Sequence, residues 1–281
     1  GMPLTDMRLL FFGAGEAGIG IGDLVVEALM ETGVSEAKAR QQCWFVDSGG
    51  LVVQSRSVLA AGRQRYAHVH PPIADLLQAV ETLKPHAIIG VSGTPGMFTG
   101  DVLRAMARNN KHPIVLALSN PTSRAECTAE EAYVATEGRA IFASGSPFAP
   151  VTLDGRTHVP GQGNNAYIFP GVGLGVFVSQ SSRVTDEMFA AAAQTLASMV
   201  TDDDLAMGRI FPDLARIREV SHRIAIEVAA IAFRRNLARC AEPENLDAAV
   251  KSAMYEPAYV SYERRKTDPA NTKPNSGSPS R

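Results

Sequence analysis

The stretch RLLFFGAGEAGIGIG, residues 8–22, decides the fold of this chain. An apolar run leads into Gly13, Gly15 and Gly18, and an amphipathic segment at residues 19–30 follows them. This order predicts a buried strand, a tight turn and a helix. Gly13 allows the turn, Gly15 leaves room for an anion beside the backbone, and Gly18 lets the helix pack close to the strand. The N–H groups of the first helical turn are then expected to face the anion.

A second apolar run, CWFV, comes directly before Asp47 and predicts the next strand of the same unit. Where such a unit binds a dinucleotide, an acidic residue at the end of this strand accepts a hydrogen bond from the adenosine ribose. Asp47 lies 29 residues after Gly18, which is longer than the usual spacing. A short helix predicted over residues 35–42 accounts for the excess. The alternative is that Asp47 is only a polar turn residue.

The alternation of strands and helices continues along the chain. Apolar runs predict strands at residues 87–91, 114–118 and 140–144. Helical spacing and N-cap residues predict helices at residues 73–83, at residues 101–109 after Thr99, and from a capping box at residues 128–131 to Gly138. We therefore expect an α/β fold, a Rossmann-type doubly wound parallel sheet. The polar segment at residues 49–70 is predicted to be a long loop around the adenine end.

Ligands of such sheets bind outside the carboxyl ends of the strands. The segments at these ends are residues 13–16, Asp47, residues 92–96, Asn120 and residues 144–147, and the later segment GQGNN adds Asn164 and Asn165. Each asparagine alone is also typical of a plain turn, since Asn before Pro and Asn between glycines both favour irregular backbone. Three amides near one crevice can bind a carboxylate or a nicotinamide carboxamide without titrating.

The C-terminal third is predicted to be helical. Gly171, Gly173 and Gly175 resemble a second glycine fingerprint, but they follow a proline and lack an acidic partner, so close helix packing explains them better. Helices are expected at residues 186–200, after Thr201 and at residues 212–237. We expect a dinucleotide-binding domain at residues 1–180, a helical extension packed on it at residues 181–262, and a disordered tail at residues 263–281.

Composition and charge exclude several classes of protein. The 281 residues carry 27 basic and 29 acidic side chains, a net charge of −2, without a long basic block, so nucleic acid is not an expected partner. The longest apolar run is well short of the ~20 residues that span a bilayer, so no membrane partner is expected. The three scattered cysteines and the absence of a leader-like start favour a reducing compartment, and we expect a cytoplasmic protein.

Common catalytic and metal-binding motifs are missing. The sequence has no GxSxG elbow and no Gly-Lys phosphate loop, and its six histidines have no HExxH spacing. His68 and His70 are expected to be solvated. The acidic run at residues 202–204 follows Thr201, so helix capping explains it better than metal binding.

Several long blocks, in order, give the chain a resemblance to a known family. It resembles the NAD-binding half of malic enzyme over residues 4–262. The blocks that carry the resemblance are FFGAGEAGIGI, WFVDSGGLV, IIGVSGTPGMFTGDVLRAMA, ALSNPTSRAECTAEEAY, FASGSPFAPV and, most specific, PGQGNNAYIFPGVGLG. The resemblance implies oxidation of malate with NAD or NADP, and decarboxylation of oxaloacetate to pyruvate and CO2 with Mg2+ or Mn2+.

The resemblance also implies roles for particular residues. Cofactor contacts are expected from Gly13, Ala14, Gly15, Glu16, Ala17, Gly18, Asp47, Ser48, Ser92 and Gly93, and substrate contacts from Asn120, Asn164 and Asn165. NAD is the expected cofactor, because Asp47 favours a free 2′-hydroxyl and Ser48-Gly49 lacks the lysine that often follows this aspartate in NADP-using relatives. NADP is the alternative, with Arg56, Arg63 or Arg65 at the 2′-phosphate.

One departure from the family bears on activity. The family's proton-transfer tyrosine and lysine, its substrate-binding arginine and its three acidic metal ligands precede the glycine turn, and this chain has only a few residues there. We expect a fragment that needs an N-terminal catalytic domain, forms a homo-oligomer, and is inactive towards malate alone, with no catalytic or metal residue of its own. The alternatives are a non-catalytic nucleotide-binding or assembly domain and an amino-acid dehydrogenase-like domain.

Overall fold

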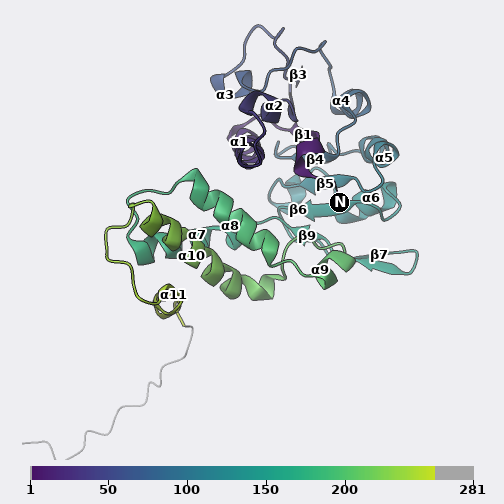
Figure 1. Ribbon diagram of the computed structural model, residues 1–281. Helices are drawn as coiled ribbons and strands as arrows, with labels where there is room; N and C mark the ends of the chain where they lie inside the picture. The colour runs from purple at the N-terminus through teal and green to yellow at the C-terminus, as the bar shows by residue number, and fades with distance from the viewer. Residues whose placement is uncertain (1, 257–281) are drawn as a thin grey trace, which may run out of the picture.

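The structure, a computed structural model, describes residues 2–256. Its centre is a seven-stranded sheet with the order β3-β2-β1-β4-β5-β6-β9, parallel except for β3 (Figure 1). The strands are β1 (Leu9–Phe12), β2 (Cys43–Asp47), β3 (Gly50–Leu51), β4 (Ala87–Gly90), β5 (Ile114–Ala117), β6 (Ile141–Ser144) and β9 (Gly161–Gln162). This confirms the predicted doubly wound α/β sheet.

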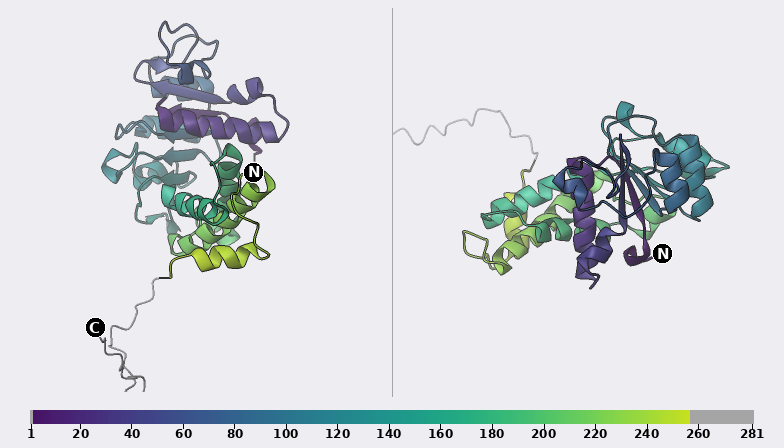
Figure 2. Two further views of the ribbon diagram at one scale, coloured as in Figure 1. Left: turned by 90° about the vertical axis from the view of Figure 1, so that its left-hand side faces the viewer. Right: turned by 90° about the horizontal axis from the view of Figure 1, so that it is seen from above.

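Helices cover both faces of the sheet (Figures 1 and 2). Leu9 and Phe11 of β1 pack towards α1 and α2, whereas Leu10 and Phe12 pack towards α4, α5 and α6. Alternate residues of a strand point to opposite faces, so a strand that is apolar throughout has both faces covered. The helices are α1 (Glu16–Glu31), α2 (Glu36–Arg40), α4 (Leu76–Leu83), α5 (Gly100–Asn109) and α6 (Ala129–Ala135).

The predicted loop at residues 49–70 and the polar stretch after residue 150 both contain short regular elements. The segment expected to be a long loop at residues 49–70 holds β3, the short helix α3 (Ala61–Gln64) and a bridge between Val53 and His68. The polar excursion after residue 150 forms a hairpin of β7 (Val151–Leu153) and β8 (Arg156–His158), and then β9, which pairs with β6. The loop prediction at residues 49–70 was wrong because strands of two or three residues are too short to show a hydrophobic period, and the short strands after residue 150 give no such signal for the same reason.

The C-terminal helices form a second layer with its own apolar cluster. Gly171 and Gly175 lie against α10: a Cβ on Gly171 would come 2.7 Å from the Cβ of Ile224, and one on Gly175 would come 2.7 Å from the Ala225 carbonyl oxygen. The predicted close helix packing is confirmed for these two glycines, whereas Gly173 has open space where a Cβ would be. The elements are α7 (Phe169–Ser179), α8 (Asp186–Ser198), α9 (Asp202–Ala206), α10 (Ile217–Arg234) and α11 (Leu246–Ala253), with 3-10 turns η1 (Leu4–Asp6), η2 (Thr122–Arg124), η3 (Asn165–Tyr167) and η4 (Leu214–Arg216).

The predicted helix N-caps at Thr99, Thr128 and Thr201 are present, with capping boxes at Thr128 and Thr201, and Thr185 caps α8 in the same way. The acidic run at residues 202–204 therefore opens α9, as predicted. The predicted tail at residues 263–281 lies outside the described residues. Within residues 2–256, no helix has both the length and the apolar character needed to cross a bilayer.

Candidate functional site

The glycine turn after β1 has the geometry that the sequence predicts. Gly13 has a φ of +116°, a backbone conformation that other residues rarely adopt. A Cβ on Gly18 would lie 2.2 Å from the Gly13 carbonyl oxygen, so the start of α1 is packed directly on the turn. Gly15 is exposed and has open space where a Cβ would be. The space beside Gly15 is therefore free for a ligand, while Gly13 and Gly18 hold the turn in shape.

The N-terminus of α1 is left open towards this space. Gly15 is the N-cap of α1, and no side chain caps the helix. Glu16, Ala17 and Gly18 form the first turn, whose N–H groups cannot bond within the helix. These donors, with the positive end of the helix dipole, make an anion site. Glu16 and Ala17 also line a cavity of about 810 Å³ that runs along α1 towards α8.

Asp47, at the end of β2, is held by two arginines. Its Oδ1 accepts from Arg56 Nη1 at 2.9 Å and from the Gly49 amide at 2.8 Å, and its Oδ2 pairs with Arg63 Nη1 at 2.9 Å. The Asp47 side chain is only 8% exposed, whereas those of Arg56 and Arg63 are 22% and 37% exposed. Ser48 next to it is exposed. The acidic residue thus places two guanidinium groups at the surface of the crevice.

Arg63 also connects Asp47 to the glycine turn. Its Nε donates to the Ala14 carbonyl oxygen at 2.8 Å. The turn and the end of β2 are therefore one unit, with a cation between them. Arg65, the third arginine named from the sequence, pairs instead with Asp23 on α1 at 3.0 Å. The structure brings Arg56 and Arg63 to the predicted ribose position and leaves Arg65 out.

The turn after β4, which contains Ser92 and Gly93, lies at the same edge of the sheet, because β4 pairs with β1 in parallel. Its backbone amides point inward. The Ser92 amide donates to Glu126 Oε1 at 3.2 Å, and the Gly93 amide donates to Ser119 Oγ at 2.9 Å. Glu126 and Ser119 were not named from the sequence, although a lone acidic residue between apolar neighbours, as in AEC at residues 125–127, is a signal for a buried carboxylate.

Two of the three predicted asparagines meet at the turn after β6. Asn120 Oδ1 accepts from Ser146 Oγ at 2.7 Å, and Asn164 Nδ2 donates to the Gly145 carbonyl oxygen at 3.3 Å. Both amides thus converge at residues 145–146 although they are 44 positions apart in the chain. Asn164 Oδ1 also caps η3 by accepting from the Ala166 amide at 2.9 Å. The peptide bond between Asn120 and Pro121 is cis.

Asn165 lies apart from these two amides. It is exposed and lines the 810 Å³ cavity together with Glu16 and Ala17. The GQGNN segment thus reaches both the amide cluster and the anion site at α1. The structure therefore gathers the predicted cofactor and substrate residues along one edge of the sheet.

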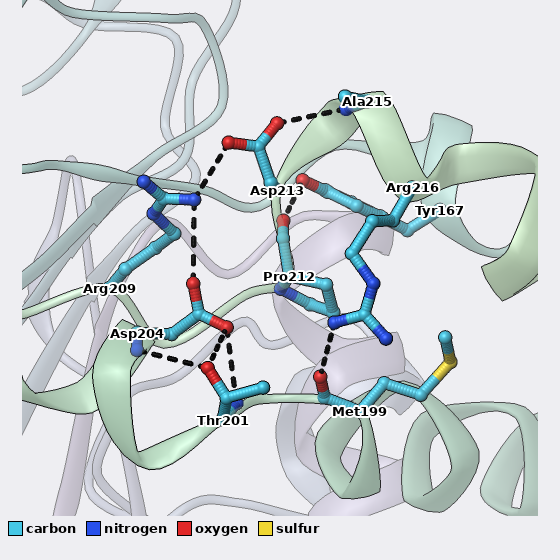
Figure 3. Close-up of polar contacts among 9 residues, drawn as sticks. All are labelled: Tyr167, Met199, Thr201, Asp204, Arg209, Pro212, Asp213, Ala215 and Arg216. Carbon is cyan, nitrogen blue, oxygen red and sulfur yellow. Dashed lines mark hydrogen bonds and ion pairs between the residues drawn. The ribbon is translucent and has the colours of Figure 1, made fainter.

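Just after the GQGNN segment, Tyr167 joins a polar network with the loop at residues 209–213 (Figure 3). Tyr167 donates to the Pro212 carbonyl oxygen at 2.6 Å and stacks on Phe211 with ring centres 5.9 Å apart. Arg209, in the same loop, pairs with Asp213 at 2.9 Å and with Asp204 at 3.4 Å. The backbone hydrogen bond from Thr201 and the guanidinium of Arg209 lower the pKa of Asp204, so this anchor is a charged one. This network could not be predicted from sequence patterns, because its members are spread over residues 167–213.

The predicted solvation of His68 was wrong. Its ring stacks on Trp44 with centres 3.7 Å apart, and its Nε2 donates to the Cys43 carbonyl oxygen at 2.9 Å. Burial lowers its pKa. The bridge between Val53 and His68 draws this ring under the segment that carries Arg56. Among residues 2–256, no three His, Cys, Asp or Glu side chains are placed to hold a metal ion together.

A family model and several known proteins are similar to this chain in sequence. A family model described as "Malic enzyme, NAD binding domain" matches residues 1–233. An NADP-dependent malic enzyme of Vitis vinifera is 51% identical over 265 residues, covering 93% of this chain and 45% of the relative. The mitochondrial NADP-dependent malic enzyme of Homo sapiens is 49% identical over 261 residues, covering 92% of this chain and 43% of the relative. The chain spans about half the length of these relatives.

Solved structures agree on the fold. The malic enzyme of Entamoeba histolytica superposes with a TM-score of 0.69 at 20% identity, covering 90% of this chain and 49% of that one. The malic enzyme of Pyrococcus horikoshii Ot3 superposes with a TM-score of 0.66 at 23% identity, covering 89% and 53%. Sequence relatives include proteins described as chloroplastic and as mitochondrial.

Proposed function

The chain belongs to the malic enzyme family, and on that premise we propose that it binds NADP at the carboxyl edge of its sheet and supplies the cofactor side of a malate-oxidising, decarboxylating active site. The observation that carries the proposal is the uncapped N-terminus of α1 beside the two arginines on Asp47. The first turn of α1 binds the pyrophosphate, with Gly15 giving it access. When bound, the nicotinamide supplies the hydride acceptor for malate oxidation.

The choice of NADP over the NAD expected from the sequence rests on the surroundings of Asp47. A carboxylate selects NAD when it is free to accept the 2′-hydroxyl, but both Asp47 oxygens already hold guanidinium groups. Arg56 and Arg63 offer the planar donors that suit a 2′-phosphate. The relatives named above are described as NADP-dependent, which supports the same choice.

A nucleotide titration tests the cofactor proposal. We expect the chain to bind NADPH at least about tenfold more tightly than NADH, because charge-assisted hydrogen bonds to the phosphate contribute about 1.5–3 kcal/mol. Nucleotide fluorescence at constant salt measures both affinities. Equal affinity, or tighter binding of NADH, would restore the preference that Asp47 alone indicates.

The amides at Asn120 and Asn164 are proposed to orient the substrate. Neutral donors can hold a dicarboxylate against the nicotinamide without changing its charge. The described residues do not fit a Mg2+ or Mn2+ site, so we propose that the metal ligands and the proton-transfer groups come from another part of the enzyme. We also propose a cytoplasmic homo-oligomer.

The outer face of α7 supports the proposal that another part of the enzyme packs against this chain. Phe169 and Phe177 are 60% and 72% exposed, and Gly173 lies between them on the same face. Two phenylalanines on one helical face are apolar area that a partner would cover. We propose that the part of the enzyme that corresponds to the additional residues of the longer relatives covers this face.

Malate-dependent NADPH formation tests the rest of the proposal. We expect none from the 281-residue chain with Mg2+ or Mn2+, and activity when the remaining part of a close relative is supplied. Turnover by the chain alone would refute the division of the site. Nucleotide binding without any restored turnover would instead favour a non-catalytic nucleotide-binding domain.

A further inference from the structure

Glu126 has a fully buried carboxyl group with no cationic partner among residues 2–256. It is 0% exposed, and in the part of the chain that the structure describes no lysine, arginine or histidine nitrogen lies within 4.0 Å of its carboxylate. Its side chain lies over the end of β4, where a Cβ on Gly90 would come 2.4 Å from Glu126 Cδ. Glycine at position 90 therefore leaves the space that the Glu126 side chain occupies. Burying such a group is expensive unless hydrogen bonds satisfy it.

Those hydrogen bonds come from the two loops that flank the candidate nucleotide site. Glu126 Oε1 accepts from the Ser92 amide at 3.2 Å, from Ser92 Oγ at 3.3 Å and from Ser119 Oγ. Its Oε2 accepts from the Ser119 amide at 3.4 Å. Ser92 follows β4 and Ser119 follows β5, directly before Asn120. One carboxylate thus joins the cofactor loop to the loop of the substrate amide.

This arrangement leaves the loop at residues 92–95 without a free amide. The Ser92 amide is bound to Glu126, the Gly93 amide to Ser119 Oγ and the Thr94 amide to Ser92 Oγ, and Pro95 has no N–H. None of these four consecutive positions therefore has a backbone N–H left to donate to an anion. The loop can meet a ligand only through carbonyl oxygens and side chains.

We propose that Glu126 is a positioning residue that turns these amides inward, so that the loop at residues 92–95 accepts hydrogen bonds from the nicotinamide half of NADP(H). The ribose hydroxyls and the carboxamide are the donors of that half, whereas its phosphates are not. The inference rests on the proposed cofactor site. It divides that site into a donor turn at α1 for phosphates and an acceptor loop after β4 for hydroxyl groups.

Two ligands test the two halves of the proposed cofactor site separately. Adenosine 2′,5′-bisphosphate occupies only the adenosine side, and NADPH occupies both. We expect Glu126→Gln to weaken NADPH binding about tenfold, since an amide nitrogen facing the Ser119 amide sets two donors against each other. Binding of the bisphosphate should stay within about twofold of wild type, because its contacts lie at Asp47 and the glycine turn.

Glu131→Gln is the matched control. Glu131 accepts from Thr128 in the capping box of α6 and makes no contact with the loop at residues 92–95, so the same chemical change should lower stability and leave both affinities unchanged. Should Glu126→Gln fold poorly, Ser119→Ala removes the hydroxyl that holds the Gly93 amide. We expect that variant to exchange the Gly93 amide hydrogen faster than wild type and to lose NADPH affinity selectively.

The results are distinguishable. Selective loss of NADPH binding supports the inference. A Glu126→Gln variant that binds NADPH like wild type, or that loses both ligands in equal proportion, overturns it while the proposed cofactor site stands. A wild-type chain that binds neither ligand overturns the proposed function and the inference with it.

Discussion

The turns after β1 and β4 lie side by side on the sheet, and both contain glycines with positive φ, yet their backbone amides are used in opposite ways. After β1, the chain enters α1 with no capping side chain, and the first-turn amides stay available. After β4, Glu126 and two serine hydroxyls take the amides of residues 92–94. A glycine-rich turn at the end of a parallel strand is therefore not an anion site by itself. What such a turn can bind depends on whether its N–H groups are already hydrogen-bonded to acceptors within the protein.

The glycines of the two turns also serve different purposes. Gly18 is required because the Gly13 carbonyl oxygen occupies the place of its Cβ. Gly93 has open space around that place, but its φ is +68°. The first turn uses glycine for a close approach of backbone to backbone, and the second uses it for a backbone conformation. Substitutions by alanine should therefore have unequal effects at the two turns.

The largest expected effect is that of Gly18→Ala. The added methyl group would lie 2.2 Å from a backbone oxygen that cannot move without displacing β1 or α1. We expect a loss of about 3 kcal/mol in the free energy of unfolding, at the upper end of overpacking effects, together with loss of nucleotide binding. Chemical denaturation measures the first and fluorescence titration the second. Gly20→Ala, in the same helix with open space around it, should stabilise the chain by up to about 1 kcal/mol.

Second in size is Arg63→Gln, which tests whether the first turn and Asp47 form one anion site. Arg63 bridges the Ala14 carbonyl oxygen and Asp47, so its loss removes a guanidinium from the proposed 2′-phosphate position. We expect NADPH affinity to fall by roughly 10- to 100-fold and NADH affinity to change much less. Arg65→Gln is the control, because Arg65 pairs with Asp23 instead. Equal losses for both nucleotides would contradict the assignment.

Gly93→Ala should have a smaller effect than either. Only the positive φ opposes the methyl group, which corresponds to about 1 kcal/mol of stability for a non-glycine residue. Because the amides of residues 92–94 stay bound to Glu126 and the serines, binding of adenosine 2′,5′-bisphosphate should be unchanged. Thermal unfolding and the same titration measure the two quantities. A large loss of bisphosphate binding would mean that the second turn contacts phosphate after all.

The sequence predicts the first turn far better than the second. The roles of Gly13, Gly15 and Gly18 follow from their order between a strand and a helix, since each depends on neighbours within a few residues. The inward amides of the second turn depend on Glu126, which is 34 positions after Ser92 and shows no periodic pattern. The predicted outline of the sheet and helices was confirmed for the same reason, because apolar period and caps are local signals.

Pairings between distant side chains were beyond the sequence. The acidic residue at position 47 could be recognised from its place after β2, but not the two arginines that hold both of its oxygens. The convergence of Asn120 and Asn164 on residues 145–146 could not be predicted either, because it depends on the register of β6 and β9. Local patterns therefore predict where a site lies, and tertiary contacts decide its chemistry.

The smallest expected effect is a pH dependence on the Asp47 side of the comparison. Burial and stacking on Trp44 hold the pKa of His68 below its usual value, so the folded chain keeps the ring neutral. As the pH falls through 6.5, His68 binds a proton in the unfolded chain before it does so in the folded chain, so the free energy of unfolding decreases. The decrease ends once the pH is below the lower pKa of the folded state. Above pH 6.5, His68 adds no pH dependence to stability. Denaturation at pH 8 and pH 5 should show a loss of stability at the lower pH. His68→Gln should reduce this loss, and the same change at the exposed His112 should not.

The fluorescence of Trp44 offers a second measurement of the same titration. Trp44 is the only tryptophan in the sequence, so its fluorescence should report the protonation of His68 directly, with a midpoint below 6.5. A midpoint that is not below 6.5 would mean that the ring is less buried under the segment carrying Arg56 and Arg63 than the structure describes.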